Sequence, residues 1–174
     1  MKEIPLTKYS SIIYDVVLHK TSIRNKFMIF FGTLNIRDTF AIKINANKKS
    51  INSISLIKSK IKNKGLRPTA KWNFKVSTLK TIKNLNLEYG KKYNYKITTK
   101  DQTIKLFIDD NEILSHEVKG NINSGRFGFS NRNGIIEIDN VIVKDGEKVV
   151  FQDNFDTLSI KRYGVKFNKI KKKK

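Results

Sequence analysis

The sequence predicts an all-β protein, folded as an antiparallel sandwich or jelly roll of two sheets. Residues 91–156 form a series of short segments in which apolar and polar residues alternate, separated by tight turns at Asp109-Asp110-Asn111 and Asn131-Arg132-Asn133-Gly134. Connections this short join only antiparallel neighbours, so this part of the chain is a meander. About ten to twelve such strands, spaced about 8 to 12 residues apart, are typical of a sandwich or barrel. No part of the sequence shows the alternating strand and helix patterns that predict a parallel sheet.

Each expected strand follows from the period of two that a half-buried strand requires. The apolar run 27–32 predicts a central strand that is covered on both faces. Residues 46–70 are interpreted as a strand followed by a loop, because no helix caps accompany their isoleucines. Residues 79–87 are either a short helix or a further strand. The remaining expected strands cover residues 9–19, 39–45, 72–76, 93–99, 104–108, 113–118, 125–130, 134–143 and 149–156.

One strand changes its buried face part-way along. Ile136 and Ile138 occupy even positions, whereas Val141 and Val143 occupy odd ones. Such a change requires an extra residue, which predicts a β-bulge at Asp139-Asn140. We expect a structural role there, with the Asp139 carboxylate tying down a neighbouring loop.

Length and composition predict one domain. The 174 residues are divided into a loose N-terminal segment (1–8), a β-sandwich (9–156) and a basic C-terminal tail (157–174). No apolar run reaches the ~18 residues needed to cross a bilayer. The first thirty residues lack the order of a signal peptide, so either the protein stays inside the cell or a leader has been removed. The absence of cysteine excludes disulfides and thiolate metal sites.

The net charge of +21 raises the question of a polyanionic partner. The 30 lysines greatly outnumber the 6 arginines, and 24 isoleucines and 18 asparagines accompany them. This bias is typical of a genome rich in A and T, whereas nucleic-acid sites favour arginine. We therefore attribute most of the charge to base composition and solubility. The tail is considered separately as a polyanion contact, through Lys169, Lys171, Lys172, Lys173 and Lys174.

Six segments, in order, resemble the concanavalin A-like jelly-roll modules that accompany catalytic domains in bacterial glycan-degrading enzymes. The resemblance covers most of residues 9–156 and implies a sandwich fold, a non-catalytic glycan-binding role and a location outside the cytoplasm or at the cell surface. The segments are Leu66-Arg67-Pro68, Lys92-Tyr93-Asn94-Tyr95-Lys96-Ile97, Ile104-Lys105-Leu106-Phe107-Ile108-Asp109, Ser124-Gly125-Arg126-Phe127-Gly128-Phe129, Ile138-Asp139-Asn140-Val141-Ile142-Val143 and Val150-Phe151-Gln152-Asp153-Asn154-Phe155.

The chain departs from that pattern in three places. Asp110 stands where a glycine is usual, and Ile138 stands where an aromatic residue is usual. The N-terminus lacks a copy of the closing segment, so residues 149–156 are either this module's own closing strand or the joint to a following domain.

Catalytic patterns are incomplete. Glucanases of similar architecture carry Glu-x-Asp-x-x-Glu on one strand, and retaining hydrolysis needs two carboxyl groups about 5 Å apart. Here Glu137 and Asp139 are present, but Ile142 replaces the third carboxylate. The two histidines, His19 and His116, lie inside expected strands, and no serine occupies a nucleophile elbow. We therefore expect no enzymatic activity.

Two kinds of binding site remain as hypotheses. A structural calcium ion, as in related jelly-roll modules, would be held by Asp139, Asp153 and Asp156; the alternative is that these residues cap turns. A glycan site needs exposed rings with polar groups around them, although the alternating pattern around Trp72 favours a core position. The glycan candidates are Arg67, Trp72, Tyr89, Tyr93, Asn131 and Arg132.

The leading interpretation is a non-catalytic module that binds a glycan, with the basic surface favouring anionic or sulfated chains. The first alternative is a structural subunit of a surface filament, envelope or particle, which would contact other protein subunits. A third hypothesis is binding to nucleic acid or acidic lipid through the lysine-rich tail.

Overall fold

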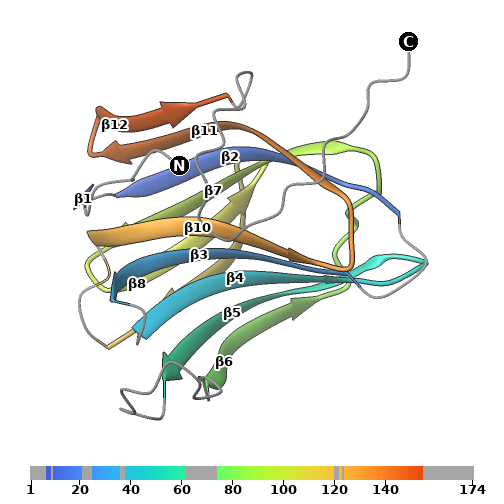
Figure 1. Cartoon of the computed structure of the whole chain (residues 1–174), viewed down its shortest axis with the longest axis horizontal. Coiled ribbons are helices and arrows are strands. Elements are labelled where there is room, and N and C mark those ends of the chain that lie inside the picture. Colours follow the sequence, from blue (N-terminus) through green and yellow to red (C-terminus); the bar gives the residue numbers. More distant parts are fainter. Residues whose placement is uncertain are drawn as a thin grey trace, which may run out of the picture.

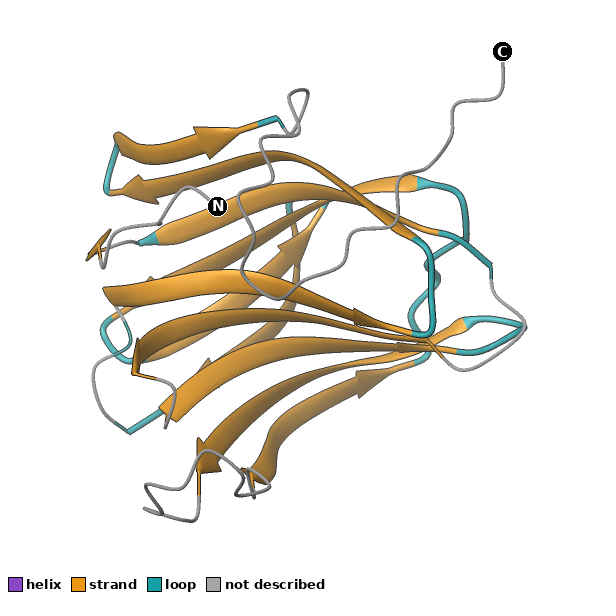
Figure 2. Ribbon diagram, viewed as in Figure 1, coloured by secondary structure: helices purple, strands orange, loops and turns teal. Residues whose placement is uncertain are grey.

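In the computed structural model, the described residues form strands and loops without any helix (Figure 2). They comprise residues 7–8, 10–20, 25–35, 38–61, 74–119, 122 and 124–154. No helix in this part of the chain could therefore span a membrane. The strands are β1 (Thr7–Lys8), β2 (Ser11–Leu18), β3 (Asn25–Asn35), β4 (Asp38–Ala46), β5 (Ile51–Ile61), β6 (Phe74–Lys83), β7 (Lys92–Lys100), β8 (Thr103–Ile108), β9 (Asn111–Glu117), β10 (Ser124–Arg132), β11 (Ile136–Asp145) and β12 (Lys148–Asp153).

The strands form two six-stranded sheets, whose arrangement is visible in Figure 1. Sheet I has the order β1-β10-β3-β4-β5-β6, and sheet II has the order β12-β11-β2-β7-β8-β9. Every pairing is antiparallel. β10 lies beside β3 in sheet I, and β11 lies beside β2 in sheet II, so the chain passes repeatedly from one sheet to the other. The prediction of an all-β, two-sheet antiparallel jelly-roll sandwich is confirmed.

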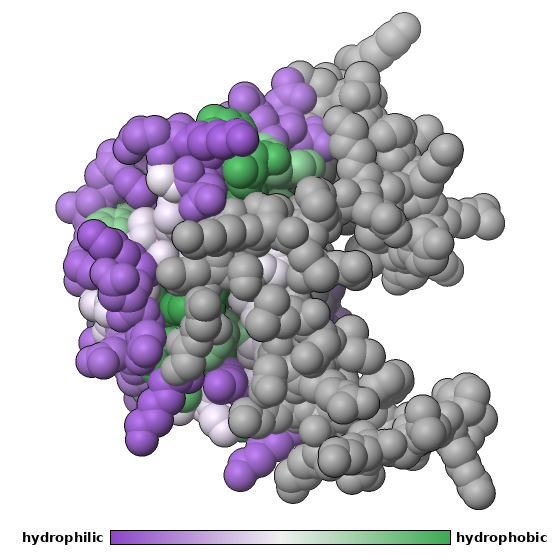
Figure 3. Space-filling view, turned by 90° about the vertical axis from the view of Figure 1, so that its left-hand side faces the viewer, coloured by the Kyte–Doolittle hydropathy of each residue, from purple (hydrophilic) through white to green (hydrophobic). Residues whose placement is uncertain are grey.

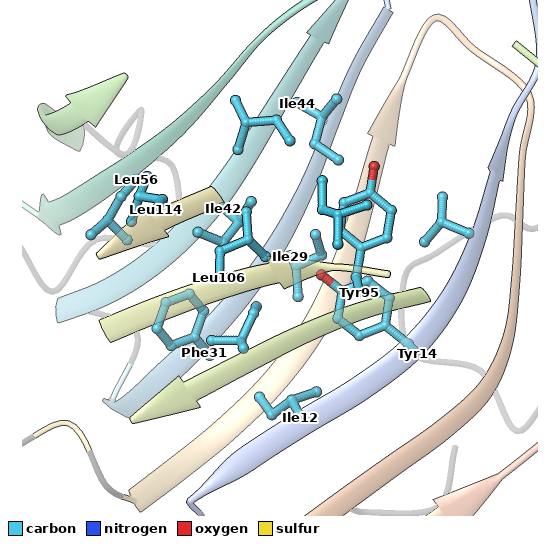
Figure 4. Packing of buried hydrophobic residues seen from close by; sticks show 14 of the residues in the cluster. Ile12, Tyr14, Ile29, Phe31, Ile42, Ile44, Leu56, Tyr95, Leu106 and Leu114 are labelled. Atoms are coloured by element: carbon cyan, nitrogen blue, oxygen red, sulfur yellow. The ribbon is translucent and has the colours of Figure 1, made fainter. Parts of the chain in front are cut away.

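The core lies between the sheets and is filled by alternate residues of the facing strands. Tyr14 of β2 and Tyr95 of β7 are fully buried on the sheet II side, and Ile29 of β3 and Ile42 of β4 are fully buried on the sheet I side (Figure 4). The buried cluster includes aliphatic and aromatic side chains from nearly every central strand. One continuous core of this kind makes the described strands a single packed unit.

Two uncertain regions of the sequence are strands. Residues 51–61 form β5, with Ile54 and Leu56 fully buried, as the strand-and-loop interpretation requires. Residues 74–83 form β6, so residues 79–83 are a strand, and the helical alternative is wrong. Leu85 and Leu87, in the loop that follows, pack against the core while staying partly exposed.

The apolar run at 27–32 is a central strand, but only one of its faces is fully covered. Phe27, Ile29 and Phe31 are buried on the core side. Met28 and Phe30 point to the outer side of sheet I and are only half-buried. The expectation of two covered faces is corrected here, because a sandwich places just one face of each sheet against the core.

The predicted bulge is present in β11. Asp139 pairs with Asp15, and the next registered pair is Ile142 with Ile13, so β11 contains one extra residue. Asn140 adopts a left-handed conformation with φ of 50°, which asparagine tolerates better than most residues. The Asp139 Oδ1 atom accepts a hydrogen bond from the Asn140 N–H at 2.8 Å. Asp139 therefore stabilises the bulge itself. Its partners among the described residues are Asn140 and Lys92 of β7, and neither belongs to a neighbouring loop, so the expected loop contact is not seen in this part of the chain.

The two ends of the described chain both join sheets. Thr7 and Lys8 pair with Ser124 and Gly125 of β10, so residues expected in a loose segment begin the sandwich. At the other end, β12 pairs with β11 and forms an edge of sheet II. This pairing supports the interpretation of residues 149–156 as the module's own closing strand. The tail 157–174 lies outside the described residues.

Candidate functional site

Charge is divided unequally between the two sheets. The strands of sheet I contain ten lysine and arginine residues and a single acidic residue, Asp38, whereas the strands of sheet II contain six lysines and seven acidic residues. Net charges of +9 and −1 follow from these counts. The positive charge of the sandwich is therefore concentrated in sheet I, which composition could not reveal.

Acidic partners neutralise several cations of sheet II. Lys105 lies 2.8 Å from Glu112, and the Lys92 ammonium lies 3.9 Å from Asp15 and 3.8 Å from Asp139. By contrast, no lysine or arginine of sheet I whose side chain the structure describes makes an ion pair with a described carboxylate. Among the described side chains, the positive field of sheet I is consequently not reduced by ion pairs.

The sheet register aligns polar residues in a row across the outer face of sheet I. Each of the strands β10, β3, β4, β5 and β6 contributes one residue, and each of these residues is paired with the one on the next strand. Five neighbouring strands extend over about 19 Å. Asn45 and Ser53 lie at the centre, where the Asn45 Nδ2 donates to the Ser53 Oγ at 3.1 Å. The row consists of Arg132, Lys26, Asn45, Ser53 and Lys83.

A second row lies two residues further along the strands. Lys43 pairs with Met28 of β3 and with Ser55 of β5. Ser55 is buried, and its hydroxyl lies 2.9 Å from the Thr81 hydroxyl. Lys43 therefore adds a fourth cation beside the first row. We call Lys26, Lys43, Lys83 and Arg132, together with Asn45 and Ser53, the basic face.

The predicted glycan residues fall into three groups. Arg132 is exposed and belongs to the basic face. Asn131 is its exposed neighbour, and its amide donates to the Gly134 carbonyl at 2.6 Å, which closes the turn into β11. Arg67 and Trp72 lie outside the described residues, as do Lys169, Lys171, Lys172, Lys173 and Lys174 of the tail.

The two tyrosine candidates hold loops together. Tyr93 is 7% exposed and its hydroxyl accepts the Glu88 N–H at 2.9 Å, so its ring has no free face for a sugar. This burial corrects its assignment as a stacking platform. The Tyr89 hydroxyl donates to the Asn47 and Ser50 carbonyls, the latter at 2.9 Å. Tyr89 thus attaches the loop before β7 to the loop between β4 and β5.

The carboxylates proposed for calcium remain untested as a site. Asp139 lies in the bulge of β11, Asp153 pairs with Val141 from β12, and Asp156 lies outside the described residues. Within the described ranges, no group of three or more histidine or acidic side chains could hold a metal ion. Calcium at this position stays a hypothesis.

The partial glucanase pattern lies on the outer face of sheet II. Glu137 and Asp139 pair with Val17 and Asp15, and Ile142 follows after the bulge. Both carboxylates have partners: Glu137 lies 2.8 Å from the His19 Nε2, and Asp139 contacts Lys92 and the Asn140 N–H. Both carboxylates of the partial pattern are thus engaged with neighbouring groups, and Ile142 stands at the position of its third carboxylate.

The cations of the basic face other than Arg132 were missed by sequence reasoning because they are isolated from one another along the chain. Lys26, Lys43 and Lys83 lie on three different strands. One signal was available: residues 16–87 contain a single acidic residue, Asp38. A long segment of outward-facing strand residues with one sign of charge is the pattern that would have indicated this face.

Comparison with solved structures relates the fold to known sandwiches. No family model and no curated protein sequence matches the chain. The carbohydrate-binding module CBM66 from Bacillus subtilis superposes with a TM-score of 0.58 and 15% identity, over 80% of this chain and 77% of that one. The chain has a concanavalin A-like jelly-roll fold.

Two galectins are similar at a comparable level. Human galectin-16, in a variant form, gives a TM-score of 0.53 with 12% identity, over 84% of this chain and 98% of that one. Sheep galectin-11, solved with glycerol, gives 0.52 with 11% identity, over 82% of this chain and 98% of that one. At such identities the likeness concerns the fold alone.

Proposed function

We propose that this chain is a non-catalytic module that binds an anionic glycan across the basic face of sheet I. The observation that carries the proposal is the segregation of charge, with a net +9 in the strands of sheet I against −1 in those of sheet II. The carbohydrate-binding module and the galectins that share the fold support a glycan as ligand. The positive charge of the face supports acidic groups on that glycan.

The spacing of the cations suits a chain with repeated acidic groups. A single exposed ammonium–anion contact contributes only about 0–1 kcal/mol, so useful affinity requires several contacts at once. Lys26, Lys43, Lys83 and Arg132 can act together because the sheet holds them on one face. Asn45 and Ser53, between them, supply amide and hydroxyl groups for sugar hydroxyls.

Nucleic acid suits this face less well. Proteins that bind single strands stack bases on aromatic rings, at about 1–3 kcal/mol per base. Among the described outward-facing side chains of sheet I, the aromatic one is Phe30, and it is half-buried. The acidic groups of an anionic glycan can be held by cations and hydrogen bonds without a stacked ring, so the lack of exposed rings counts less against this ligand than against a nucleic-acid strand.

Assembly into a filament or particle finds little support on the described surface. The large apolar residues that are most exposed, Val76 (55%), Ile135 (54%) and Val149 (46%), lie on β6, before β11 and on β12. The described residues that are visible in Figure 3 are mostly hydrophilic, with small separate hydrophobic areas. Subunit interfaces usually have a continuous apolar centre.

The first prediction tests the site directly. Replacing Lys26→Gln and Lys83→Gln should weaken binding to sulfated or uronate-rich glycans on an array by at least tenfold, because two contacts of the cross-strand row are lost. The control is Lys100→Gln with Lys148→Gln, which removes the same charge from exposed positions of sheet II. We expect the control to bind within twofold of the unchanged chain.

Three outcomes of the array would overturn the proposal. Equal weakening by both variants would show that net charge, and not the basic face, drives binding. Equal binding to neutral glycans would remove the requirement for acidic groups. Tighter binding to single-stranded DNA than to any glycan, at the same salt concentration, would identify nucleic acid as the ligand class.

A further inference from the structure

A cavity of about 280 Å³ opens where sheets I and II separate, beside β6 and β9. It lies on the inner side of sheet I, the side opposite to the basic face. Phe40 of β4, Lys58 of β5 and Leu79 of β6 line it from sheet I. His116 of β9 and Val118, just after β9, line it from the other layer.

Local irregularities of the two edge strands shape this cavity. In β6 the register jumps between the Leu56–Lys80 and Ile57–Thr78 pairs, so Leu79 is an extra bulge residue that packs against the core. The Lys80 ammonium donates to the Ser115 carbonyl of β9 at 2.9 Å and links the two edges beside the opening.

The chain after β9 is also held in place. The Val118 N–H donates to the Gln102 carbonyl, in the turn between β7 and β8, at 2.9 Å. The Val118 side chain is 7% exposed, so the cavity has a fixed apolar wall on this side.

Lys58 is the unusual group of the cavity. Its side chain is half-buried, and its ammonium lies 4.9 Å from the centre of the Phe40 ring. Within the described part of the chain it forms no ion pair. A ring face compensates only part of the hydration that a cation loses on burial. An anion placed beside this ammonium would supply the missing partner.

The charges around the opening are compatible with an anion. Lys119 is exposed at the rim, and His116 adds a polar ring. Among the described residues that line the cavity, Glu117 is the one with a carboxylate, and it is exposed, so water and salt screen its repulsion.

We propose that this cavity binds a carboxylate carried on a single six-membered ring. The carboxylate would contact the Lys58 ammonium, and the ring would lie against Leu79 and Val118. The volume is close to the lower limit of about 300 Å³ for small-molecule pockets, which leaves room for one ring and little more. This second site is separate from the basic face, and it stands or falls independently of the proposed function.

Two kinds of ligand carry a carboxylate on a six-membered ring. One is a free aromatic or alicyclic acid, and the other is the acidic sugar at the end of a glycan. Titration of the full chain with benzoate, glucuronate, benzamide and glucose, followed by amide chemical shifts in NMR spectra, separates them. We expect benzoate or glucuronate to shift the amides of Leu79, His116 and Val118 saturably. The neutral counterpart of the acid that binds should bind at least tenfold more weakly.

Variants locate the contact. Lys58→Gln should weaken the acid at least tenfold, whereas Lys75→Gln, at an exposed position of β6, should leave its affinity within twofold. The Lys26→Gln and Lys83→Gln variant should also bind the acid normally, even if it no longer binds long glycans. The variants thus distinguish an error in the proposed glycan site on the basic face from an error in the proposed acid site in the cavity.

Several results would overturn the proposal. Equal binding of benzoate and benzamide, with glucuronate no better than glucose, would show that the carboxylate is not recognised. Shifts far from β6 and β9, or no saturable shifts with either acid, would remove the site. These comparisons use the unchanged chain, so they decide the question even if Lys58→Gln does not fold.

Discussion

At the scale of single residues, Tyr14 and Tyr95 are the least expected feature of the core. Their rings stack with centres 5.6 Å apart and planes 12° apart (Figure 4). Both hydroxyl groups are buried and have no hydrogen-bond partner among the residues that the structure describes. A buried hydroxyl without a partner costs stability, which the stacking of the two rings and the contact of Tyr14 with Phe129 must offset.

The second prediction follows from these hydroxyl groups. Tyr95→Phe should leave the free energy of unfolding unchanged or raise it, by up to about 1–3 kcal/mol, because an unsatisfied polar atom is removed from the core. Urea denaturation measures the change. The control, Tyr93→Phe, deletes an acceptor that the Glu88 N–H uses, and should lower stability by about 1 kcal/mol. A clear loss of stability in Tyr95→Phe would reveal a partner for its hydroxyl.

The third prediction concerns alkaline pH. Burial raises the pKa of both Tyr14 and Tyr95 above the usual value of about 10 for tyrosine. The unfolded chain therefore releases these protons first, so the stability they contribute is complete below about pH 10 and is lost as the pH rises above it. Urea midpoints from pH 8 to pH 11 should fall steeply in the upper part of this range. The Tyr14→Phe and Tyr95→Phe double variant should show a shallower fall, and an unchanged slope would contradict the assignment.

At the scale of elements, one carboxylate connects three strands of sheet II. The Asp15 Oδ1 accepts the Asn94 amide and the Asp15 Oδ2 accepts the Asn140 amide, each at 2.8 Å. Asp15 thus joins β2 to β7 and to the bulge of β11. The change of apolar parity was sufficient to predict the bulge, but not the residue that holds it. Asn94 and Asn140 are 79 and 125 positions away from Asp15, so only strand pairing brings them together.

The fourth prediction tests this connection. Asp15→Ala leaves two side-chain amides without their acceptor and should destabilise the fold by about 2–3 kcal/mol, since hydrogen bonds to charged groups contribute about 1.5–3 kcal/mol. Asp139→Ala is the matched control, because its carboxylate is more exposed (42% against 15%) and should cost no more than about 1 kcal/mol. Chemical denaturation of both variants gives the comparison. Equal losses of stability in the two variants would show that stability depends on the bulge as a whole and not on the hydrogen bonds of Asp15.

At the scale of the whole molecule, the charge of sheet I acts on stability as well as on binding. Uncompensated lysines repel one another, and this repulsion is screened within about 10 Å at 0.1 M salt. This repulsion acts on the outer face of sheet I, while the largely apolar core between the sheets holds them together.

The fifth prediction is that added salt raises the stability of the folded protein and lowers its affinity for an anionic ligand. The thermal midpoint should rise when sodium chloride increases from 10 to 200 mM, because screening relieves repulsion on sheet I. The Lys26→Gln and Lys83→Gln variant should melt at a higher temperature than the unchanged chain at low salt, and the two should converge at high salt. A lower melting temperature of the variant at low salt would contradict the expected repulsion.

The sequence by itself determined the fold class, because alternation of apolar residues and the chemistry of short turns act over only a few neighbouring positions. The same local signals located the bulge at Asp139-Asn140. The hairpin that they predicted around Asn131-Gly134 is wrong, because Arg132 ends β10 in sheet I and the next strand, β11, belongs to sheet II. Only the tertiary structure decided that Tyr93 is buried and that Lys26, Lys43 and Lys83 join Arg132 on one face. These facts depend on which strands pair and on which side faces the core, and both are set by contacts between residues far apart in the chain.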